Sequence, residues 1–256
     1  MDFTLNEIQQ ELKEQARAWL SVRYPLDRDW EGQDDRWSEL EELGWLDVAA
    51  AELGFVEEAL LLEEMGYALY PGPYLAHVTG LKDAFGPGGT IVTVDPTRPL
   101  HRLAQAADET PRFRAGAAAE AVGIAQRALE LGIQHASTRT QFGKPIGAYQ
   151  AVSHPLADTY TDVELARSLA YWAAWCIAND DAQAAVAAAA AKAFATEAAV
   201  AACERSIQVH GGTGFTWEHP LHRFYKRALW LEGFGKRPAQ LRAEVADAIL
   251  GVAIPA

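Results

Sequence analysis

The sequence is short of basic residues and of cysteine, and each shortage argues against a class of protein. Its 256 residues include 22 lysines and arginines against 35 aspartates and glutamates, so the net charge is −13. A charge of this sign opposes nucleic acid or an anionic membrane surface as the main partner. The two cysteines, Cys176 and Cys203, lie in alanine-rich helical patterns. We expect them to be small core residues rather than parts of a disulfide or a zinc site.

The sequence also has no uninterrupted apolar run of the roughly 20 residues that cross a bilayer. Its longest alanine-rich stretch is interrupted by Lys192 and Glu197. The amino-terminal segment is acidic and amphipathic, and it lacks the basic start and apolar run of a secretory signal. These absences predict no membrane span and a cytoplasmic location.

Hydrophobic residues make up half of the chain, enough for a sizeable core, and their spacing in residues 1–80 is helical. Thr4 and Glu7 form a capping-box pattern that predicts a first helix up to Arg23. Two further helices are predicted at residues 37–44 and 55–69. The last of these carries four glutamates that we expect on its solvent side: Glu57, Glu58, Glu63 and Glu64.

The rest of the chain divides into a short irregular part and a long helical part. Residues 81–112 are rich in proline and glycine and hold one β-like run, at 90–94, which allows one hairpin at most. Residues 113–256 return to helical periodicity in segments with short connections, which predicts an antiparallel four-helix bundle. Strands and helices do not alternate, so a doubly wound nucleotide-binding fold is not expected. The predicted fold class is therefore mainly α.

Two glycine-containing segments could carry chemistry. In Arg139–Gly147, a guanidinium able to pair with phosphate precedes an aromatic ring at a glycine turn, although a plain helix end capped by Gly143 explains the pattern equally well. In Gln208–Phe215, three glycines in four positions would let backbone N–H groups approach a diphosphate closely. A helix-ending turn needs only one glycine, so the second segment favours a ligand site.

These segments resemble a known family. RTQFGKPIGAYQAVSHPLADTYTDVELAR and QVHGGTGFTWEHPLHRFYKRA are similar to the carboxy-terminal helical domain of acyl-CoA dehydrogenases, and LGW and LEEMGYALYPGPYL to their amino-terminal domain. In that family both motifs contact FAD across a subunit interface. The resemblance implies that the first motif contacts FAD through Arg139, Gln141, Phe142, Ile146 and Gln150, and the second through Gln208, Gly211 and Gly212.

Two departures from the family pattern bear on activity. Full-length members carry a β-domain that covers the flavin and helps to hold the acyl-CoA, whereas here only residues 81–112 remain as a remnant or linker. The family's usual base is a glutamate whose ungapped position here is Gly235, while other members place it near the position of Phe113, which is no acid. Glu232 is the nearest carboxylate and precedes a glycine, as in the family. It is the candidate base, with a surface glutamate as the alternative.

The resemblance implies α,β-dehydrogenation of an acyl-CoA thioester, with FAD and an electron-transfer flavoprotein as acceptor. Paired-subunit bacterial members act on steroid side chains, and this chain resembles their non-catalytic subunit, with a related subunit that carries the β-domain. A flavin-free acid/base enzyme and a purely structural subunit remain as alternatives. Three nearby histidines lack the spacing of a metal site, so no metal is expected: His210, His219 and His222.

Overall fold

The computed structural model describes residues 4–30, 34–81, 83–86, 88–102 and 109–251 and confirms a mainly helical fold. The only sheet among these residues is a two-stranded hairpin, β1 (Thr140–Gln141) and β2 (Lys144–Pro145). The α-helices are α1 (Glu7–Arg23), α2 (Trp37–Glu42), α3 (Phe55–Ala68), α4 (Tyr74–Thr79), α5 (Pro111–Thr138), α6 (Gln150–Ala178), α7 (Ala184–His210), α8 (Leu221–Gly233) and α9 (Pro238–Leu250). Short 3-10 turns are η1 (Val48–Ala51), η2 (Ile146–Ala148) and η3 (Gly211–Phe215).

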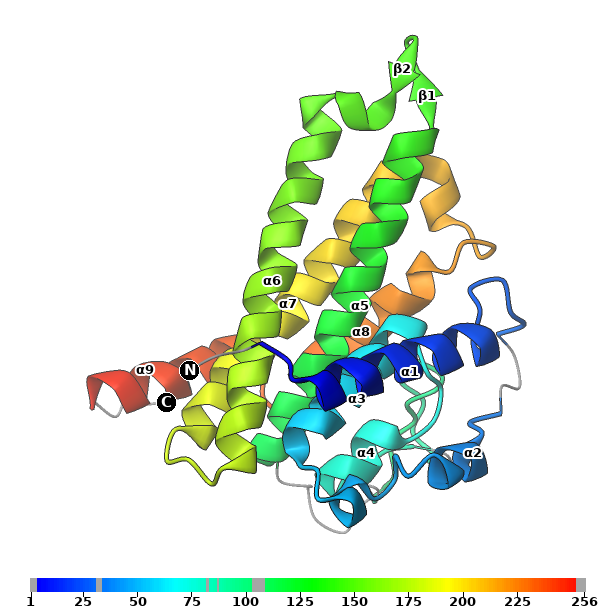
Figure 1. Cartoon of the computed structure of the whole chain (residues 1–256). Coiled ribbons are helices and arrows are strands. Elements are labelled where there is room, and N and C mark those ends of the chain that lie inside the picture. Colours follow the sequence, from blue (N-terminus) through cyan, green and yellow to red (C-terminus); the bar gives the residue numbers. More distant parts are fainter. Residues whose placement is uncertain (1–3, 31–33, 82, 87, 103–108, 252–256) are drawn as a thin grey trace.

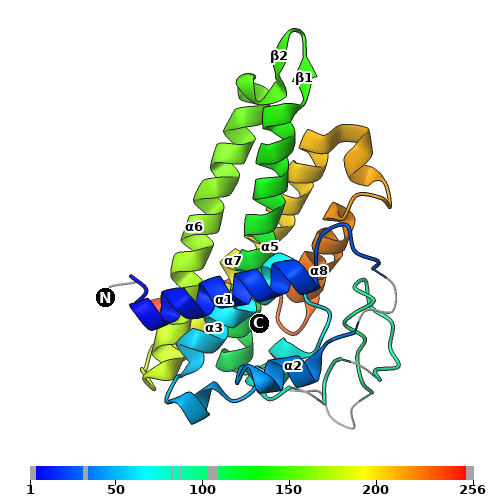
Figure 2. The same ribbon diagram turned by 45° about the vertical axis from the view of Figure 1, so that its right-hand side comes forward.

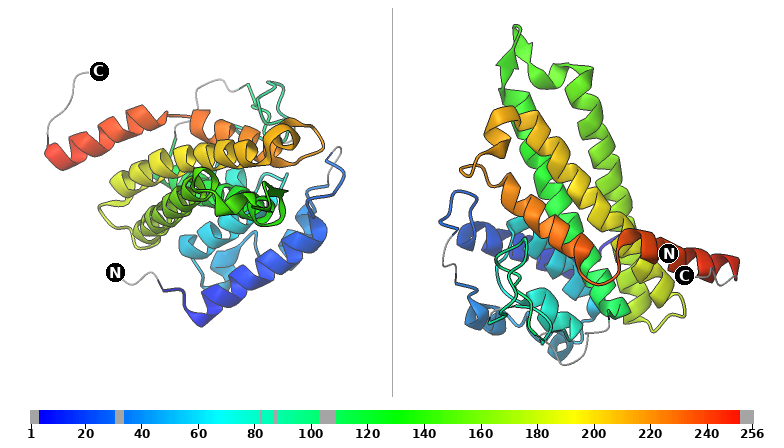
Figure 3. Two further views of the ribbon diagram at one scale, coloured as in Figure 1. Left: turned by 90° about the horizontal axis from the view of Figure 1, so that it is seen from above. Right: turned by 180° about the vertical axis from the view of Figure 1, so that it is seen from behind.

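Helices α5 to α8 run up and down beside one another, as the short connections predicted (Figure 1). The most extensive packing joins α5 to α7, and α6 packs on both. Helices α1 and α3 cross the lower half of this bundle, and α9 packs on α7 and points away from it (Figure 3). The upper ends of α5, α6 and α7 therefore stand clear of the amino-terminal helices.

The first helix begins two residues later than predicted. Asn6, not Thr4, is the N-cap: its side chain accepts from the Gln9 N–H at 2.9 Å, and the Gln9 side chain accepts from the Asn6 N–H at 3.1 Å. The Gln9 amide also donates to Glu57 of α3 at 2.8 Å. The later start joins the cap to the neighbouring helix, a tertiary contact that a local pattern does not reveal.

The prediction that the α3 glutamates face solvent was wrong. Glu63 and Glu64 are 1% and 0% exposed, Glu57 is buried and Glu58 is half-buried. Helix α3 lies between α1 on one side and α5 and α6 on the other, and these helices supply the partners of Glu63. Lys13 donates to it at 2.9 Å, and Arg167 at 3.1 Å. Burial acts to raise the pKa of Glu63, but these two cations outweigh it and hold the pKa below its usual range.

Two glycines let α3 and α5 approach closely. A Cβ on Gly123 would lie 1.9 Å from the carbonyl oxygen of Glu63, and a Cβ on Gly66 would lie 2.1 Å from that of Glu120. No side chain larger than hydrogen fits at either position without moving a helix backbone. The two glycines thus permit the close packing of α3 on α5.

The described residues between α4 and α5 form loops rather than a β-ladder (Figure 2). Buried ion pairs anchor them to the bundle. The predicted run at residues 90–94 is not a strand, because only Ile91 pairs, in an isolated bridge with Leu100. Asp95 of this segment is buried and accepts from Arg227 of α8, which is 0% exposed. Arg227 and Arg98 both donate to buried Glu120 of α5. This network fixes the segment against the bundle.

Helix α7 is long and rich in alanine. Ala184–Phe215 is long and apolar enough to cross a membrane. Length and composition alone therefore do not support the prediction that the chain has no membrane span. Its most apolar window is 67% buried inside the protein, under α5, α6, α8 and α9. That burial is typical of a core helix. Cys176 and Cys203 are both free and buried, as expected.

Candidate functional site

The first predicted motif forms a hairpin that projects beyond the ends of α5 and α6 (Figure 1). Arg139 ends α5, and its carbonyl accepts from the N–H of Ile146 at 2.8 Å, which closes the base of the hairpin. The side chains of Arg139, Gln141 and Gln150 are exposed, and that of Ile146 is half-buried against the core. The hairpin thus presents its polar residues to the outside of the chain.

The tip of this hairpin holds an apolar ring on an unfavourable backbone. Phe142 and Gly143 have φ values of 51° and 82°, as in the tight hairpin turns in which Asn and Gly are preferred. A phenylalanine in this conformation costs on the order of 1 kcal/mol. Its ring is 92% exposed, and its described ring contact is the edge of Tyr149, 6.5 Å away. Since the chain gains little from Phe142, the ring fits a role in contact with another molecule.

The second predicted motif follows the carboxy-terminal end of α7 as η3. Gly211 caps the helix with φ 60° and ψ −138°, a conformation that favours glycine, and Gly214 packs tightly on the carbonyl of Ile207. Gly212 differs from both, because its φ is not in the left-handed region and a Cβ there would meet nothing within 4 Å. Nothing within the described structure requires glycine at this position. A molecule that approaches the backbone closely would require it.

Both motifs lie at the same end of the bundle (Figures 1 and 3). They are joined there by a contact that the sequence did not reveal. The ring of His135, in the last turn of α5, lies 4.3 Å from that of His210, the last residue of α7. Gln208 is exposed one turn before the glycines. The residues expected to contact FAD therefore lie at one end of the bundle and most of them are exposed, while their role in binding it stays a prediction.

The candidate base Glu232 lies away from this end. It occupies the last turn of α8, which starts near the glycine-rich turn and runs down the bundle for about 16 Å before reaching it. Burial, together with Glu197 and Glu204 of α7, raises the pKa of Glu232. Arg237 is the cation that acts against this shift. Glu232 thus faces an acidic surface of α7.

Aromatic side chains fill the space on the other face of α8. Phe85, from the segment before α5, packs its ring 4.8 Å from Trp230 and 5.2 Å from Phe234. Phe113, at the start of α5, lies 5.0 Å from Phe234 and is 0% exposed. Of the two positions suggested for a base, position 113 thus belongs to a packed aromatic cluster. Position 232 lies in sequence between two members of that cluster, Trp230 and Phe234. Among the described residues no side chain in this cluster can accept a proton.

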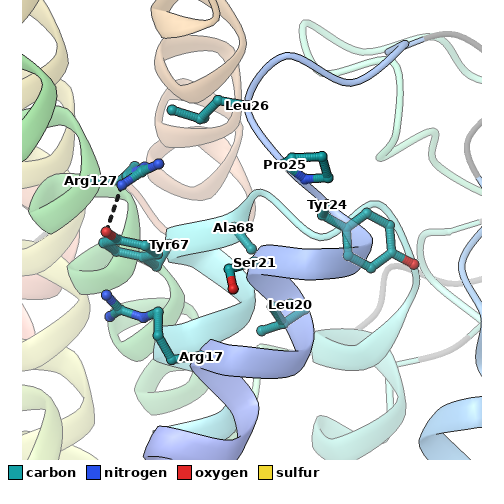
Figure 4. A pocket seen from close by; sticks show the side chains of 9 residues that line it. All are labelled: Arg17, Leu20, Ser21, Tyr24, Pro25, Leu26, Tyr67, Ala68 and Arg127. Atoms are coloured by element: carbon teal, nitrogen blue, oxygen red, sulfur yellow. Dashed lines mark hydrogen bonds between the residues drawn. The ribbon is translucent and has the colours of Figure 1, made fainter.

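A narrow cavity of about 60 Å³ lies elsewhere, between α1, α3 and α5 (Figure 4). Arg17 stacks 3.3 Å from the ring centroid of Tyr67, and Arg127 donates to the Tyr67 hydroxyl at 2.6 Å. Both cations already have carboxylate partners, in Glu64 and Glu130. None of the predicted site residues lines this cavity, and its charges are compensated within the chain, so we assign it no ligand.

Comparisons with known proteins agree with the motifs. A family profile described as "Acyl-CoA dehydrogenase, C-terminal domain" matches residues 103–236. The chain is 40% identical over 146 residues to acyl-CoA dehydrogenase IpdE2 of Mycobacterium tuberculosis, covering 54% of this chain and 44% of the relative. It is 37% identical over 152 residues to the probable acyl-CoA dehydrogenase YngJ of Bacillus subtilis, covering 59% and 39%. The chain thus spans less than half the length of these curated relatives.

Solved structures share the fold over nearly the whole chain. The ChsE4-ChsE5 complex from Mycobacterium tuberculosis matches with a TM-score of 0.80 and 21% identity, covering 100% of both chains. A steroid ACAD, Tcur3481-Tcur3483, matches with a TM-score of 0.77 and 23% identity, covering 97% and 99%. Butyryl-CoA dehydrogenase from Megasphaera elsdenii matches with a TM-score of 0.81 and 19% identity, covering 98% and 100%. Identities this low show the fold alone, and the family follows from the profile, which matches more than half of the sequence. The chain belongs to the acyl-CoA dehydrogenase family.

Proposed function

We propose that this chain is the FAD-contacting, non-catalytic subunit of a hetero-oligomeric acyl-CoA dehydrogenase. A related subunit that carries the β-domain completes the flavin site and supplies the base. The observation that carries the proposal is the exposed ring of Phe142 on its strained turn, together with the open surface at Gly212. Neither feature stabilises the chain itself, and each fits contact with a molecule held between two subunits.

The residues of the two motifs fit the parts of FAD. The exposed Arg139 guanidinium can pair with the diphosphate, and Phe142 can cover the adenine or ribityl surface. The Gly211–Gly212 backbone can approach the diphosphate, with Gln208 adding an amide next to it. When bound, FAD accepts the hydride that leaves the β-carbon of the thioester. This chain's part is to hold and orient the dinucleotide at its exposed end.

The aromatic cluster supports a base from the partner. The α-proton of a thioester must be removed by a group within hydrogen-bond reach. Phe113 has no basic group, and Glu232 lies on the face of α8 that meets Glu197 and Glu204. The described residues hold no β-domain that would cover a flavin, and Phe85 of the short segment packs into the aromatic cluster. A substrate site complete within one copy of this chain is not supported.

The substrate and partners follow from relatives. We propose the CoA thioester of a steroid side chain as substrate, because a solved structure with this fold is described as a steroid ACAD. A hetero-oligomer is supported by the match to the ChsE4-ChsE5 complex over the full length of both chains. An electron-transfer flavoprotein is the proposed acceptor, and the cytoplasm the proposed location, since the apolar window of α7 is mostly buried.

Two other functions compete with this proposal. A flavin-free acid/base enzyme on the same scaffold would have no need for an exposed Arg139 and an open Gly212. A purely structural subunit would stabilise its partner without touching FAD. Arg139→Ala in the assembled complex separates the latter from our proposal, because flavin is lost only if this chain contacts it.

The first experiment is an absorption spectrum of the purified chain, alone and after co-expression with a full-length dehydrogenase encoded beside it. We expect a flavin band only in the complex, and its loss in the Arg139→Ala complex. A flavin-free complex would overturn the proposal. A yellow complex that keeps its flavin with Arg139→Ala, Phe142→Asn and Gly212→Ala would assign FAD to the partner and this chain to a structural role.

A further inference from the structure

Three histidine rings form a column behind the glycine-rich turn. His210 is central: its ring lies 4.3 Å from that of His135 on α5 and 4.4 Å from that of His219 in the loop before α8. His210 is 9% exposed, and the other two are half-buried. The column connects the ends of α5 and α7 to the loop that follows Gly211–Phe215. Imidazoles are the usual proton-accepting side chains of proteins near physiological pH.

The hydrogen bond of His210 fixes which of its nitrogens carries hydrogen. Nδ1 lies 2.8 Å from the carbonyl oxygen of Ser206. A carbonyl only accepts, so Nδ1 donates, and in the neutral ring Nε2 is the unprotonated nitrogen. Nε2 is therefore the atom of His210 at which a proton can be added. Adding it leaves the bond to Ser206 intact.

The helix ends next to the column are carboxy-terminal ends, which disfavour a bound anion. Anions bind well at helix amino-termini, where free N–H groups and the positive end of the helix dipole meet them. Here the glycine-rich turn follows the carboxy-terminus of α7, and the carboxy-terminus of α5 lies beside it. A diphosphate at Gly211 and Gly212 therefore meets two negative helix ends. Its charge has to be balanced by side chains.

The side chains that can provide this charge are cationic or can become so. The charge of Arg139 contributes to lowering the pKa of His135, and His222 contributes to lowering the pKa of His219. Beyond His222 lie Arg223 and Lys226 of α8, while Glu218, next to His219 in sequence, is exposed to solvent. Arg139 is the permanent cation at the end of α5. The column is the nearby group whose charge can change.

In the free chain the surroundings of the two outer rings disfavour their protonation. Burial and then the neighbouring His210 lower the pKa of His135. Burial, His210 and His135 lower the pKa of His219 to about 4. A nearby anion acts in the opposite direction, because an opposite charge favours the protonated form. Since two protonated rings 4.3 Å apart would repel each other, only one of the three gains a proton readily.

We propose that a dinucleotide diphosphate bound at Gly211 and Gly212 draws one proton onto the His135–His210–His219 column, with Nε2 of His210 as the central acceptor. This inference rests on the proposed function, in which FAD provides the diphosphate. His210 is a positioning residue in this scheme. It holds the end of α7 through Ser206, and its added charge offsets the two helix ends without touching the reacting atoms.

The test is calorimetric titration of FAD into the apoprotein, using the chain or its complex with the β-domain subunit, whichever binds FAD. Titrations at pH 7.5 in two buffers with different heats of ionisation give the number of protons taken up per FAD. We expect about one proton, with affinity rising by up to about tenfold for each unit decrease in pH while the column titrates. The absorption band of bound flavin reports binding independently.

Two variants assign the proton. His210→Asn keeps an N–H donor for the Ser206 carbonyl but cannot be protonated, so uptake should fall to near zero while FAD still binds, more weakly. His154→Gln, at an exposed position on α6, is the matched control and should behave as wild type. If His210→Asn does not fold, NMR of the wild-type protein with labelled histidine replaces it, and we expect one imidazole of the column to become an imidazolium on adding FAD.

The outcomes are distinguishable from those that test the proposed function. FAD that binds wild type without proton uptake overturns this inference and leaves the proposed function intact. Uptake that persists in His210→Asn, or that disappears equally in His154→Gln, also overturns it. Failure of FAD to bind either the chain or the complex overturns the proposed function, and this inference with it.

Discussion

The ring of Phe113 packs against the ring of Phe234, with centroids 5.0 Å apart, and both belong to a cluster completed by Phe85 and Trp230. The family resemblance implies that some members place the catalytic base near the position of Phe113, and Phe234 lies two residues beyond Glu232. Phe113 thus places an aromatic ring where such a base would stand. It also fixes the start of α5 against the end of α8.

Replacing Glu232 tests whether this chain supplies the base. Glu232→Gln in the assembled complex should leave turnover within about twofold of wild type, because a base in the partner is unaffected. Steady-state kinetics with an acyl-CoA substrate provide the measurement. A loss of turnover by orders of magnitude would instead assign α-proton removal to Glu232 and contradict a non-catalytic role.

Two glycines of this chain should respond to alanine in opposite ways. Gly123→Ala places a methyl group 1.9 Å from the Glu63 carbonyl oxygen, which forces α3 and α5 apart and should cost about 3 kcal/mol of unfolding free energy. Gly212→Ala meets no atom within 4 Å and should leave the melting temperature unchanged. If Gly212 contacts FAD, only Gly212→Ala should fold normally and lose flavin. Thermal melts and flavin content measured on both variants test this pair.

The sequence predicted helices better than it predicted their surroundings. The helix predicted at residues 55–69 is α3 (Phe55–Ala68), because its apolar spacing is a local signal. The burial of Glu63 was missed because its partners Lys13 and Arg167 are 50 and 104 residues away in the chain. A row of glutamates looks the same in sequence whether its partner is water or a neighbouring helix.

Contacts between residues far apart in the chain were also missed at the candidate site. Both motifs were identified from residues adjacent in sequence, and the exposure of Phe142 and the open position of Gly212 add geometric support that sequence does not contain. His135 was missed, because its contact with His210 joins two helices that are remote in the chain. The expected FAD contacts remain predictions until flavin binding is measured.

The turn at Phe142 offers a substitution that separates folding from binding. Phe142→Asn places a residue that tolerates a φ of 51° in a turn where asparagine is preferred. We expect unchanged or slightly raised stability, by up to about 1 kcal/mol, together with weaker FAD retention in the complex. Chemical denaturation and the flavin-to-protein ratio measure the two effects. Full flavin retention would show that the exposed ring does not contact the cofactor.

Arg227 should be among the least replaceable side chains of the chain. Arg227→Met leaves Asp95 without its buried cation and removes one of the two arginines on Glu120, and should lower the free energy of unfolding by about 3–5 kcal/mol. Arg242→Met is the matched control, since its pair with Glu197 is exposed and should contribute less than about 1 kcal/mol. Equal effects in urea denaturation would contradict an anchoring role for the buried network.

Glu58 should make stability depend on pH in the direction opposite to most carboxylates. Burial, which outweighs the opposing charge of Arg112, raises its pKa in the folded chain to about 7, from an ordinary value of 4.5. Between these values the folded chain binds more protons than the unfolded chain, so this contribution to stability is present below pH 4.5 and is lost as the pH rises through 7. Glu58→Gln remains neutral throughout. The stability of wild type relative to Glu58→Gln, measured by urea denaturation, should therefore fall between pH 5 and pH 8. A constant difference would show that Glu58 is already ionised at pH 5 and that Arg112 prevails over burial.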